Sequence, residues 1–339
     1  MKRYGFLFEE AFSRESLYQA WLDAARGKHG KRACLEFSRR LATNLDALYH
    51  ELHAGSYRPQ PYTEFQVREP KLRTIYAPAF RDLVVQHAIY RVIYPIFNQS
   101  FIDQSFACRL GKGTHRAADY AQAALRAAPP GTYTLKMDVR KFFYRIDRSI
   151  LRALLARKIK DARFLRVMML FAEYGQPLGI PIGNLLSQLF ALIYLNPLDH
   201  FIKRTLGAKR YCRYVDDFVI FGWPRQKCAA ALEAVKSFLR DRLRLELSKF
   251  SIQPTARGVN FVGYRTWRST RFIRKHSLRR FTRSARRGQL ASVISILGHA
   301  RHTGSLRHLL VTLKEHYHAI FDRLPQAYRR HLHPRAATA

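Results

Sequence analysis

Two adjacent carboxylates inside an apolar run constrain the fold of this chain more than any other feature. Asp216 and Asp217 lie in the middle of residues 211–221, a β-rich and mostly apolar segment that predicts a hairpin with this pair at its tip. A second acidic position, Asp138, ends the apolar, strand-like residues 132–139. Burying like charges costs free energy unless cations neutralise them. The sequence therefore predicts neighbouring strands that bring three carboxylates together around metal ions.

Acidic residues are scarce elsewhere. The 339 residues include 60 Lys and Arg against 24 Asp and Glu, a formal net charge of +36. A surface this positive repels itself unless a polyanion neutralises it, so nucleic acid is the expected partner. A hydrophobic content of 47% is ample for a buried core and excludes a disordered tail.

Several protein classes are disfavoured. The longest apolar stretches, residues 164–172 and 185–195, are interrupted and shorter than the ~18 residues of a membrane span. Glu9 and Glu10 follow too soon after the first basic residues for a secretory signal. The cysteines are far apart and form no C-x-x-C pair; they are Cys34, Cys108, Cys212 and Cys228. We therefore expect a cytoplasmic protein with reduced thiols and no membrane partner.

The spacing of apolar residues and turn formers predicts the local structure. Helices are expected at 31–53, 82–94 (ended by Pro95), 148–157, 186–203 and 225–244, and two short strands within 62–76 joined by a turn at Pro70-Lys71. From Arg265 onward the chain holds 17 Lys and Arg against only Glu315 and Asp322. This segment still contains leucines and aromatics, so it predicts a folded, basic helical module that binds phosphates.

Mg²⁺ suits the predicted acidic site because it is a hard ion that prefers a few carboxylates together with substrate phosphates. Three carboxylates on neighbouring strands can hold two such ions roughly 3.5–4 Å apart, the arrangement for in-line phosphoryl transfer. The alternative is structural: Asp216-Asp217 would be an ordinary turn and Asp138 a helix cap. The conjunction of all three in a strongly basic chain favours the metal site.

At these residues the chain resembles the reverse transcriptase family, over nearly its whole length. Asp138 matches the first catalytic aspartate of the palm, and Tyr214-Val215-Asp216-Asp217 matches the Y-x-D-D signature. Four further segments match in the right order: residues 69–75 and 105–114 resemble two fingers motifs, 247–249 the lysine motif near the leaving pyrophosphate, and 261–264 the primer grip.

The resemblance implies an α+β right-hand polymerase fold. Residues 1–130 would be fingers with an N-terminal helical region, 131–265 an antiparallel-sheet palm and 266–339 a basic helical thumb. The implied activity is RNA-directed DNA polymerisation with two Mg²⁺ ions, Mn²⁺ being a substitute. The implied metal-binding positions are Asp138, Val139, Asp216 and Asp217.

The resemblance also assigns roles to other residues. Those at the incoming dNTP would be Lys71, Arg73, Val139, Phe143, Ile182, Gly183 and Gln188. Those at template or primer would be Arg109, Tyr214, Phe261 and Gly263. The catalytic residues would be Asp138, Asp216, Asp217 and Lys249, of which Lys249 would act as a general acid. Some of these residues also have a purely structural alternative. Lys71 and Arg73 could belong to a solvated charged hairpin, and Lys249 could be a surface lysine. Phe143 could be a core residue, since only one of Phe142 and Phe143 can face the site.

One motif points to a subfamily. Most reverse transcriptases carry Q-G-x-x-x-S-P where this chain has Ile182 and Gln188 in place of the Gln and the Pro. This variant, together with Ser105-Phe106-Ala107-Cys108-Arg109 of the fingers motif and residues 298–305, resembles the reverse transcriptases of diversity-generating retroelements. That resemblance implies an RNA template, a DNA or RNA primer, dNTPs, a small basic accessory protein, and errors opposite template adenines. Other readings are a defence-associated or retron-type enzyme, a degenerate polymerase-fold RNA-binding scaffold, and an intron maturase-like enzyme, for which a longer C-terminal extension would be expected.

Overall fold

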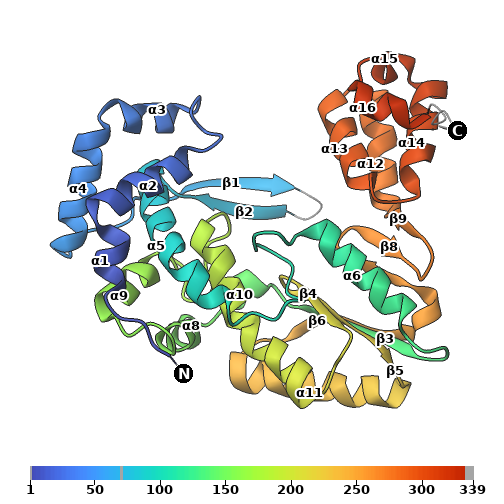
Figure 1. Ribbon diagram of the computed structural model, residues 1–339, viewed down its shortest axis with the longest axis horizontal. Helices are drawn as coiled ribbons and strands as arrows, with labels where there is room; N and C mark the ends of the chain where they lie inside the picture. The colour runs from blue at the N-terminus through green and yellow to red at the C-terminus, as the bar shows by residue number, and fades with distance from the viewer. Residues whose placement is uncertain (1, 69–71, 333–339) are drawn as a thin grey trace, which may run out of the picture. The chain divides into compact units, whose positions relative to one another are not determined.

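The computed structural model describes residues 2–68 and 72–332, and the chain divides into two compact units (Figure 1). The first unit comprises Met1–Arg109, Met137–Ala208 and Ala231–Lys249; the second comprises Leu110–Lys136, Lys209–Ala230 and Phe250–Ala339. Three elements continue from one unit into the other: β3 (Tyr133–Val139), α11 (Arg225–Leu243) and β6 (Leu247–Pro254). The division into fingers, palm and thumb stays a prediction.

The first unit is mainly helical. Its elements are α1 (Leu7–Phe12), α2 (Arg14–Ala25), α3 (Arg32–Arg39), α4 (Leu41–His53), β1 (Thr63–Arg68), β2 (Leu72–Ala77), α5 (Phe80–Asn98), α7 (Phe142–Arg145), α8 (Arg148–Ala156), α9 (Ala162–Leu170), α10 (Leu185–His200) and the π-helix η1 (Phe201–Thr205). The helix predicted at 31–53 is divided at Arg40, which leaves the helical conformation with ψ 47°. The helix predicted to stop before Pro95 continues to Asn98. Buried Ile96 and Phe97 hold its last turn in the core despite the missing N–H of the proline.

Helix α10 forms the centre of the first unit. The segment Leu185–Thr205 has the length and composition of a membrane span, but 67% of its most apolar window is buried inside the protein, as in a core helix. The Tyr194 hydroxyl donates to the carbonyl of Leu243 (2.7 Å) and accepts from the backbone N–H of Asp147 (3.2 Å). Asp147 in turn caps α8 by accepting from the N–H of Ser149 at 2.8 Å. These bonds fix α8 and the end of α11 against α10.

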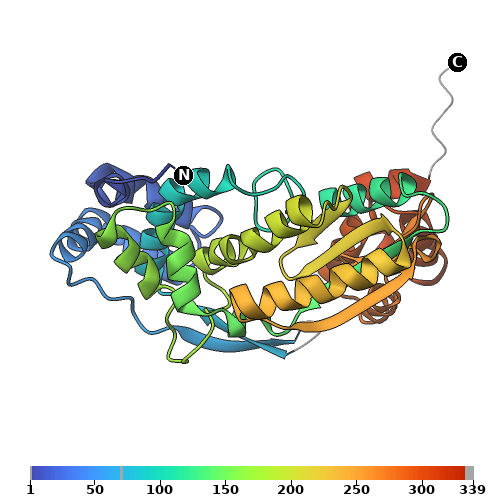
Figure 2. The same ribbon diagram turned by 90° about the horizontal axis from the view of Figure 1, so that it is seen from below.

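The hairpin of β1 and β2 extends beyond the helices of this unit (Figure 1, Figure 2). The two strands pair antiparallel from Thr63↔Ala77 to Arg68↔Leu72. The predicted strands are therefore confirmed, whereas the predicted turn at Pro70-Lys71 lies outside the described residues. Every residue of β1 is exposed, whereas Tyr76 of β2 is buried.

A four-stranded sheet has the order β4-β5-β3-β6, with β4 (Tyr211–Tyr214) and β5 (Asp217–Trp223) joined as a hairpin. The predicted hairpin at 211–221 is confirmed, but its predicted tip is wrong by one residue. Asp217 pairs with Tyr214, so the two-residue turn consists of Val215 and Asp216. Val215 takes φ 56°, a left-handed conformation that is rare for a β-branched residue.

The second unit also contains a smaller sheet and a helical module. Its remaining elements are α6 (Thr114–Arg126), η2 (Thr255–Arg257), β7 (Val259–Phe261), β8 (Tyr264–Thr266), β9 (Arg271–Ile273), α12 (Lys275–Arg286), α13 (Leu290–Ala300), α14 (Ser305–His316), α15 (His318–Phe321), α16 (Gln326–Arg329) and η3 (Arg330–Leu332). Strands β7, β8 and β9 form an antiparallel sheet in that order. Helices α12 to α15 surround one apolar cluster that includes Phe281, Leu297 and Leu310. The described part of the strongly basic segment, residues 265–332, is therefore folded and mainly helical.

Candidate active site

Asp138 lies near the end of β3, on the more exposed face of that strand. Leu135, Met137 and Val139 are buried, whereas Lys136 and Asp138 are partly exposed, which is the period-two pattern of a strand with one covered face. Within the first unit, the Ser248 hydroxyl donates to Oδ1 of Asp138 and approaches its backbone carbonyl at 3.2 Å. The first predicted aspartate is therefore held by a side chain of β6.

The neighbour of that serine is Lys249, the predicted general acid, and its side chain is exposed. The backbone N–H of Arg140 donates to the carbonyl of Glu246 at 2.8 Å, which sets the register between this part of β6 and the end of β3. The motif at 247–249 thus lies beside Asp138 in the first unit. The acid role of Lys249 stays a prediction.

Phe143 and Phe142 have different surroundings. Phe142 is only 2% exposed and its ring lies 6.3 Å from that of Tyr194, whereas Phe143 is partly exposed. The carbonyl of Phe143 accepts from the backbone N–H of Ile180 at 2.9 Å, and Gly179 is so close that a Cβ there would lie 2.7 Å from that oxygen. Of the two aromatic rings, Phe143 is the more exposed, and its role as a sugar gate stays a prediction.

Ile182 and Gly183 contact strand β2 directly. The backbone N–H of Tyr76 donates to the carbonyl of Ile182 at 2.7 Å. A Cβ on Gly183 would lie 2.8 Å from Cγ2 of Ile75 and 3.0 Å from the carbonyl oxygen of Tyr76. The same strand carries Arg73, whose side chain is exposed; Lys71 lies outside the described residues. The first unit thus brings Phe143, Ile182, Gly183 and the strand of Arg73 into one connected set.

The beginning of α10 is held by two further contacts. The buried amide of Asn184 donates to the Tyr62 hydroxyl at 2.8 Å, and the backbone N–H of Leu186 donates to the side chain of Gln86 at 3.3 Å. Gln188, one turn later, is exposed. These contacts leave Gln188 as an accessible polar side chain on a fixed helix.

The close approach at Gly183 gives a stability prediction. Gly183→Ala adds a methyl group at φ +120° against Ile75 and the Tyr76 carbonyl, so the free energy of unfolding should fall by about 2–4 kcal/mol. Gly175→Ala is the matched control, because Gly175 also has a positive φ (+79°) but nothing within 4 Å of an added Cβ. Urea unfolding of both variants measures the difference; equal losses would contradict a specific clash at Gly183.

In the second unit, side-chain hydrogen bonds hold the turn between β4 and β5. The guanidinium of Arg213, which is 0% exposed, donates to the carbonyl of Val215 at 2.9 Å. The Tyr214 hydroxyl lies 3.2 Å from the hydroxyl of Thr114 on α6. Asp216 therefore occupies a turn that a buried side chain holds in a strained conformation.

Asp217 forms an ion pair within the same unit. Its Oδ2 atom lies 2.8 Å from Nζ of Lys136, and the two side chains are 22% and 23% exposed. Burial, and then the nearby charge of Asp217, raises the pKa of the Cys212 thiol well above its usual range, so this cysteine stays protonated. Lys136 therefore offsets part of the negative charge of Asp217.

The predicted primer grip is bonded to the helical module. Phe261 is buried, and Gly263 (φ +89°) lies so close to α13 that a Cβ would be 2.8 Å from Nε2 of His299. The Tyr264 hydroxyl donates to the carbonyl of His299 at 2.8 Å, and the two rings stack at 4.2 Å. Burial lowers the pKa of His299, so the ring is neutral at pH 7. The turn at Gly263 is thus positioned by a histidine of the segment 298–305.

Arg109 has internal contacts. Its guanidinium donates to the side chain of Asn98 at 2.8 Å and to the carbonyls of Ile102 (2.7 Å) and Ser105 (2.9 Å). This guanidinium therefore shapes the loop that follows α5. A template contact by Arg109 stays a prediction.

The side chains of Asp138, Asp216 and Asp217 are chemically suited to divalent metal ions, because their carboxylate oxygens are hard ligands. Among residues 2–68 and 72–332, no group of three or more His, Cys, Asp or Glu side chains is gathered closely enough to hold a metal ion. Asp138 belongs to the first unit and the pair to the second. A three-carboxylate centre therefore stays a prediction.

Four residues of these surroundings were missed by sequence reasoning: Lys136, Arg213, Ser248 and His299. A signal existed for Lys136, because it lies two positions before Asp138 and so on the same strand face. Ser248 lies inside the matched motif at 247–249, in which only Lys249 was predicted to have a role. The contacts of Arg213 and His299 cannot be predicted from the local sequence pattern.

Comparison with known proteins gives a family match and several relatives. A family model described as reverse transcriptase (RNA-dependent DNA polymerase) matches residues 66–266, more than half of the chain. Protein YkfC of Escherichia coli (strain K12) is 26% identical over 318 residues, covering 79% of this chain and 83% of YkfC. Group II intron-encoded protein LtrA of Lactococcus lactis subsp. cremoris is 23% identical over 293 residues, covering 64% of this chain and 48% of LtrA. The match thus spans about half of LtrA.

Solved structures bear on the fold. The apo telomerase from Candida tropicalis has a TM-score of 0.54 and 12% identity, covering 81% of this chain and 61% of that one. Together with the helices and antiparallel sheets described above, this likeness and the family match confirm the predicted α+β right-hand polymerase fold.

Proposed function

Because this chain belongs to the reverse transcriptase family, and so is an RNA-directed DNA polymerase, we propose that it copies RNA into cDNA with two Mg²⁺ ions held by Asp138, Val139, Asp216 and Asp217. Its proposed substrates are dNTPs on a primed RNA template, in the cytoplasm. The family as a whole uses divalent metal ions. When bound here, they would supply charge neutralisation at the transferred phosphoryl group.

One observation carries the proposal: the chain of backbone contacts from Phe143 through Ile182 to strand β2. Phe143 is bonded to Ile180, and Ile182 is bonded to Tyr76. This links the proposed sugar gate, the segment proposed to meet the nascent base pair, and the strand proposed to meet the triphosphate.

The residues of the chain have separable tasks in this proposal. Arg73, with Lys71, would bind the triphosphate, and Phe143 would exclude a 2′-hydroxyl. Lys249 would give a proton to the leaving pyrophosphate. Arg109, Tyr214, Phe261 and Gly263 would position template and primer, and Gly183 and Gln188 would border the incoming nucleotide.

We further propose that this polymerase is error-prone opposite template adenines and belongs to a diversity-generating retroelement, acting with a small basic accessory protein. The support is Ile182, a partly exposed side chain that cannot hydrogen-bond where most of the family carries Gln. A second candidate, a reverse transcriptase of the group II intron or retron branch, is favoured by the similarity to LtrA. The base dependence of errors separates the two.

Restoring the amide gives the test. Ile182→Gln should lower the misincorporation frequency opposite adenine by up to about tenfold, because one hydrogen bond contributes roughly 0.5–1.5 kcal/mol to discrimination. The effect on the other three template bases should be smaller. Deep sequencing of cDNA made from a defined RNA template, with and without a cognate accessory protein, measures both.

Ile182→Leu is the control, since it keeps an apolar side chain of the same size. It should leave the error spectrum unchanged. A wild-type spectrum that is flat across the four template bases, with the cognate partner present, would remove the diversity-generating assignment and leave the polymerase assignment intact.

A further inference from the structure

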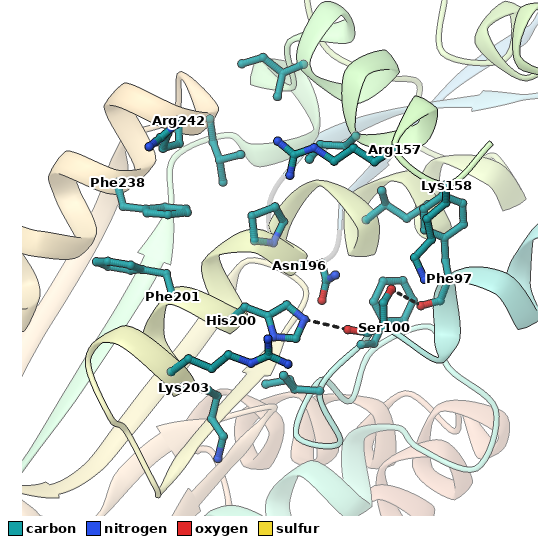
Figure 3. Close-up of a pocket in the computed structure, with 18 of the residues that line it drawn as sticks. Phe97, Ser100, Arg157, Lys158, Asn196, His200, Phe201, Lys203, Phe238 and Arg242 are labelled. Carbon is teal, nitrogen blue, oxygen red and sulfur yellow. Dashed lines mark hydrogen bonds between the residues drawn. The ribbon is translucent and has the colours of Figure 1, made fainter. Parts of the chain in front are cut away.

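The first unit contains a concave site that none of the residues assigned to the proposed polymerase site lines. It is a cavity of about 1130 Å³ lined by the end of α5, by α8, by the C-terminal half of α10 with η1, and by the end of α11 (Figure 3). Gln188, at the proposed nucleotide site, and His200, at this cavity, lie on one helix and are roughly 18 Å apart at 1.5 Å per residue. The cavity is therefore a distinct surface of the same unit.

Its lining is basic and lacks acid. Five cationic residues line it: Arg157, Lys158, Lys203, Arg204 and Arg242. No Asp or Glu is among the described residues that line it. Gathering this many like charges around one hollow is unfavourable unless an anion occupies it. The charge pattern calls for a polyanionic ligand.

Three of these cations are available to a ligand. The guanidinium groups of Arg157, Arg204 and Arg242 are exposed and make neither a hydrogen bond nor a salt bridge with any residue in the described part of the chain. Lys158, by contrast, donates to the carbonyl of Ile96 at 3.0 Å. Arginine binds phosphate through two parallel N–H donors, so unoccupied guanidinium groups at a cavity suit a phosphate backbone.

Aromatic rings lie beside the arginines. Phe201 and Phe238 stack with their centroids 4.5 Å apart and their planes 19° from parallel, and both are partly exposed. Figure 3 shows this pair on the same side of the cavity as Arg242, with Arg157 and His200 nearby. Basic residues combined with exposed aromatic rings are typical of sites for single-stranded nucleic acid, where bases stack on rings and phosphates meet cations.

We propose that this cavity binds a single-stranded segment of RNA, outside the stretch paired at the polymerase site. Phosphates contact Arg157, Arg204 and Arg242, and an unpaired base stacks on the Phe201–Phe238 pair. The site anchors the RNA to the first unit independently of catalysis.

The test compares two double variants that remove the same charge. Arg157→Gln with Arg242→Gln removes two proposed phosphate contacts. Arg152→Gln with Arg166→Gln is the matched control, because these two arginines are exposed, lie on α8 and α9 of the same unit, and do not line the cavity. Binding of a fluorescein-labelled, unprimed oligouridylate to the full chain is measured by anisotropy over a range of salt concentrations.

For the cavity variant we expect about tenfold weaker binding and a salt dependence reduced by about 1.4 in log–log slope, since each phosphate contact to a single strand contributes roughly 0.7. The control pair should change the slope by much less. An equal change in both pairs, or none in the cavity pair, would overturn the proposal. If the cavity instead binds an acidic protein segment, RNA binding by the cavity variant should be unchanged.

Two further measurements keep the result separate from polymerase function. Oligouridylate carrying 4-thiouridine should cross-link to Phe201 or Phe238 on irradiation, and cross-links confined to the second unit would overturn the proposal. Single-nucleotide incorporation on a short template–primer should be unchanged in the cavity variant. Its loss would mean that these arginines serve the polymerase site instead.

Discussion

Replacing Asp216 with alanine is expected to lower dNTP incorporation by at least about 10³-fold, equivalent to about 4 kcal/mol of transition-state stabilisation. Asp216 occupies the two-residue turn between β4 and β5, so the variant removes a proposed metal ligand without touching either strand. RNA binding should remain, because contacts between basic residues and phosphates supply most of that affinity. Single-turnover extension and anisotropy with the same template–primer measure the two quantities.

Asp322→Ala is a suitable control, since Asp322 is an exposed carboxylate of the second unit outside every matched motif, and it should extend primers normally. Undiminished extension by Asp216→Ala would remove the metal-ligand assignment. A wild-type protein that binds RNA but incorporates no nucleotide under any divalent ion would favour the RNA-binding scaffold.

The second large effect concerns sugar selection. Phe143→Ala should raise the ratio of rNTP to dNTP incorporation by roughly 100-fold, about 2.7 kcal/mol of lost discrimination, because the space below C2′ is no longer filled. Phe143 is the partly exposed member of the aromatic pair, and its backbone is fixed by Ile180. Competition between each rNTP and its dNTP on one template measures the ratio.

Phe142→Ala provides the comparison. Phe142 is 2% exposed, so truncating it should lower the free energy of unfolding by about 3–5 kcal/mol while leaving the sugar ratio of the folded enzyme unchanged. If Phe142 rather than Phe143 changes the ratio, the assignment of the gate is wrong by one residue.

Much of the fold was predictable because its patterns are local. Strand β3 and the strands of both predicted hairpins followed from residue type and spacing. The tip of the aspartate hairpin did not. Turn chemistry favours Asp for a positive φ, yet Val215 adopts it, and its carbonyl is held by the buried guanidinium of Arg213. That contact depends on the packing of the whole sheet.

In the candidate active site, too, contacts made by tertiary packing could not be predicted from the sequence. The residue types assigned to the chemistry stood out from the sequence, and backbone hydrogen bonds link Phe143, Ile182 and strand β2 in the structure. The ion pair of Lys136 with Asp217 and the stacking of His299 on Tyr264 join positions 81 and 35 residues apart. Such pairings are decided by tertiary packing, so only a structure reveals them.

The interleaving of the two units affects how the protein is made. The chain passes between them five times, and the last segment of the first unit ends at Lys249. At 5–20 residues per second, a ribosome needs about 12–50 s to reach that residue. Until then the apolar surface of α10 lacks part of its cover, so the nascent chain is exposed to aggregation and to chaperone binding. Slowing translation before Lys249 should therefore lower the soluble yield more than slowing it afterwards.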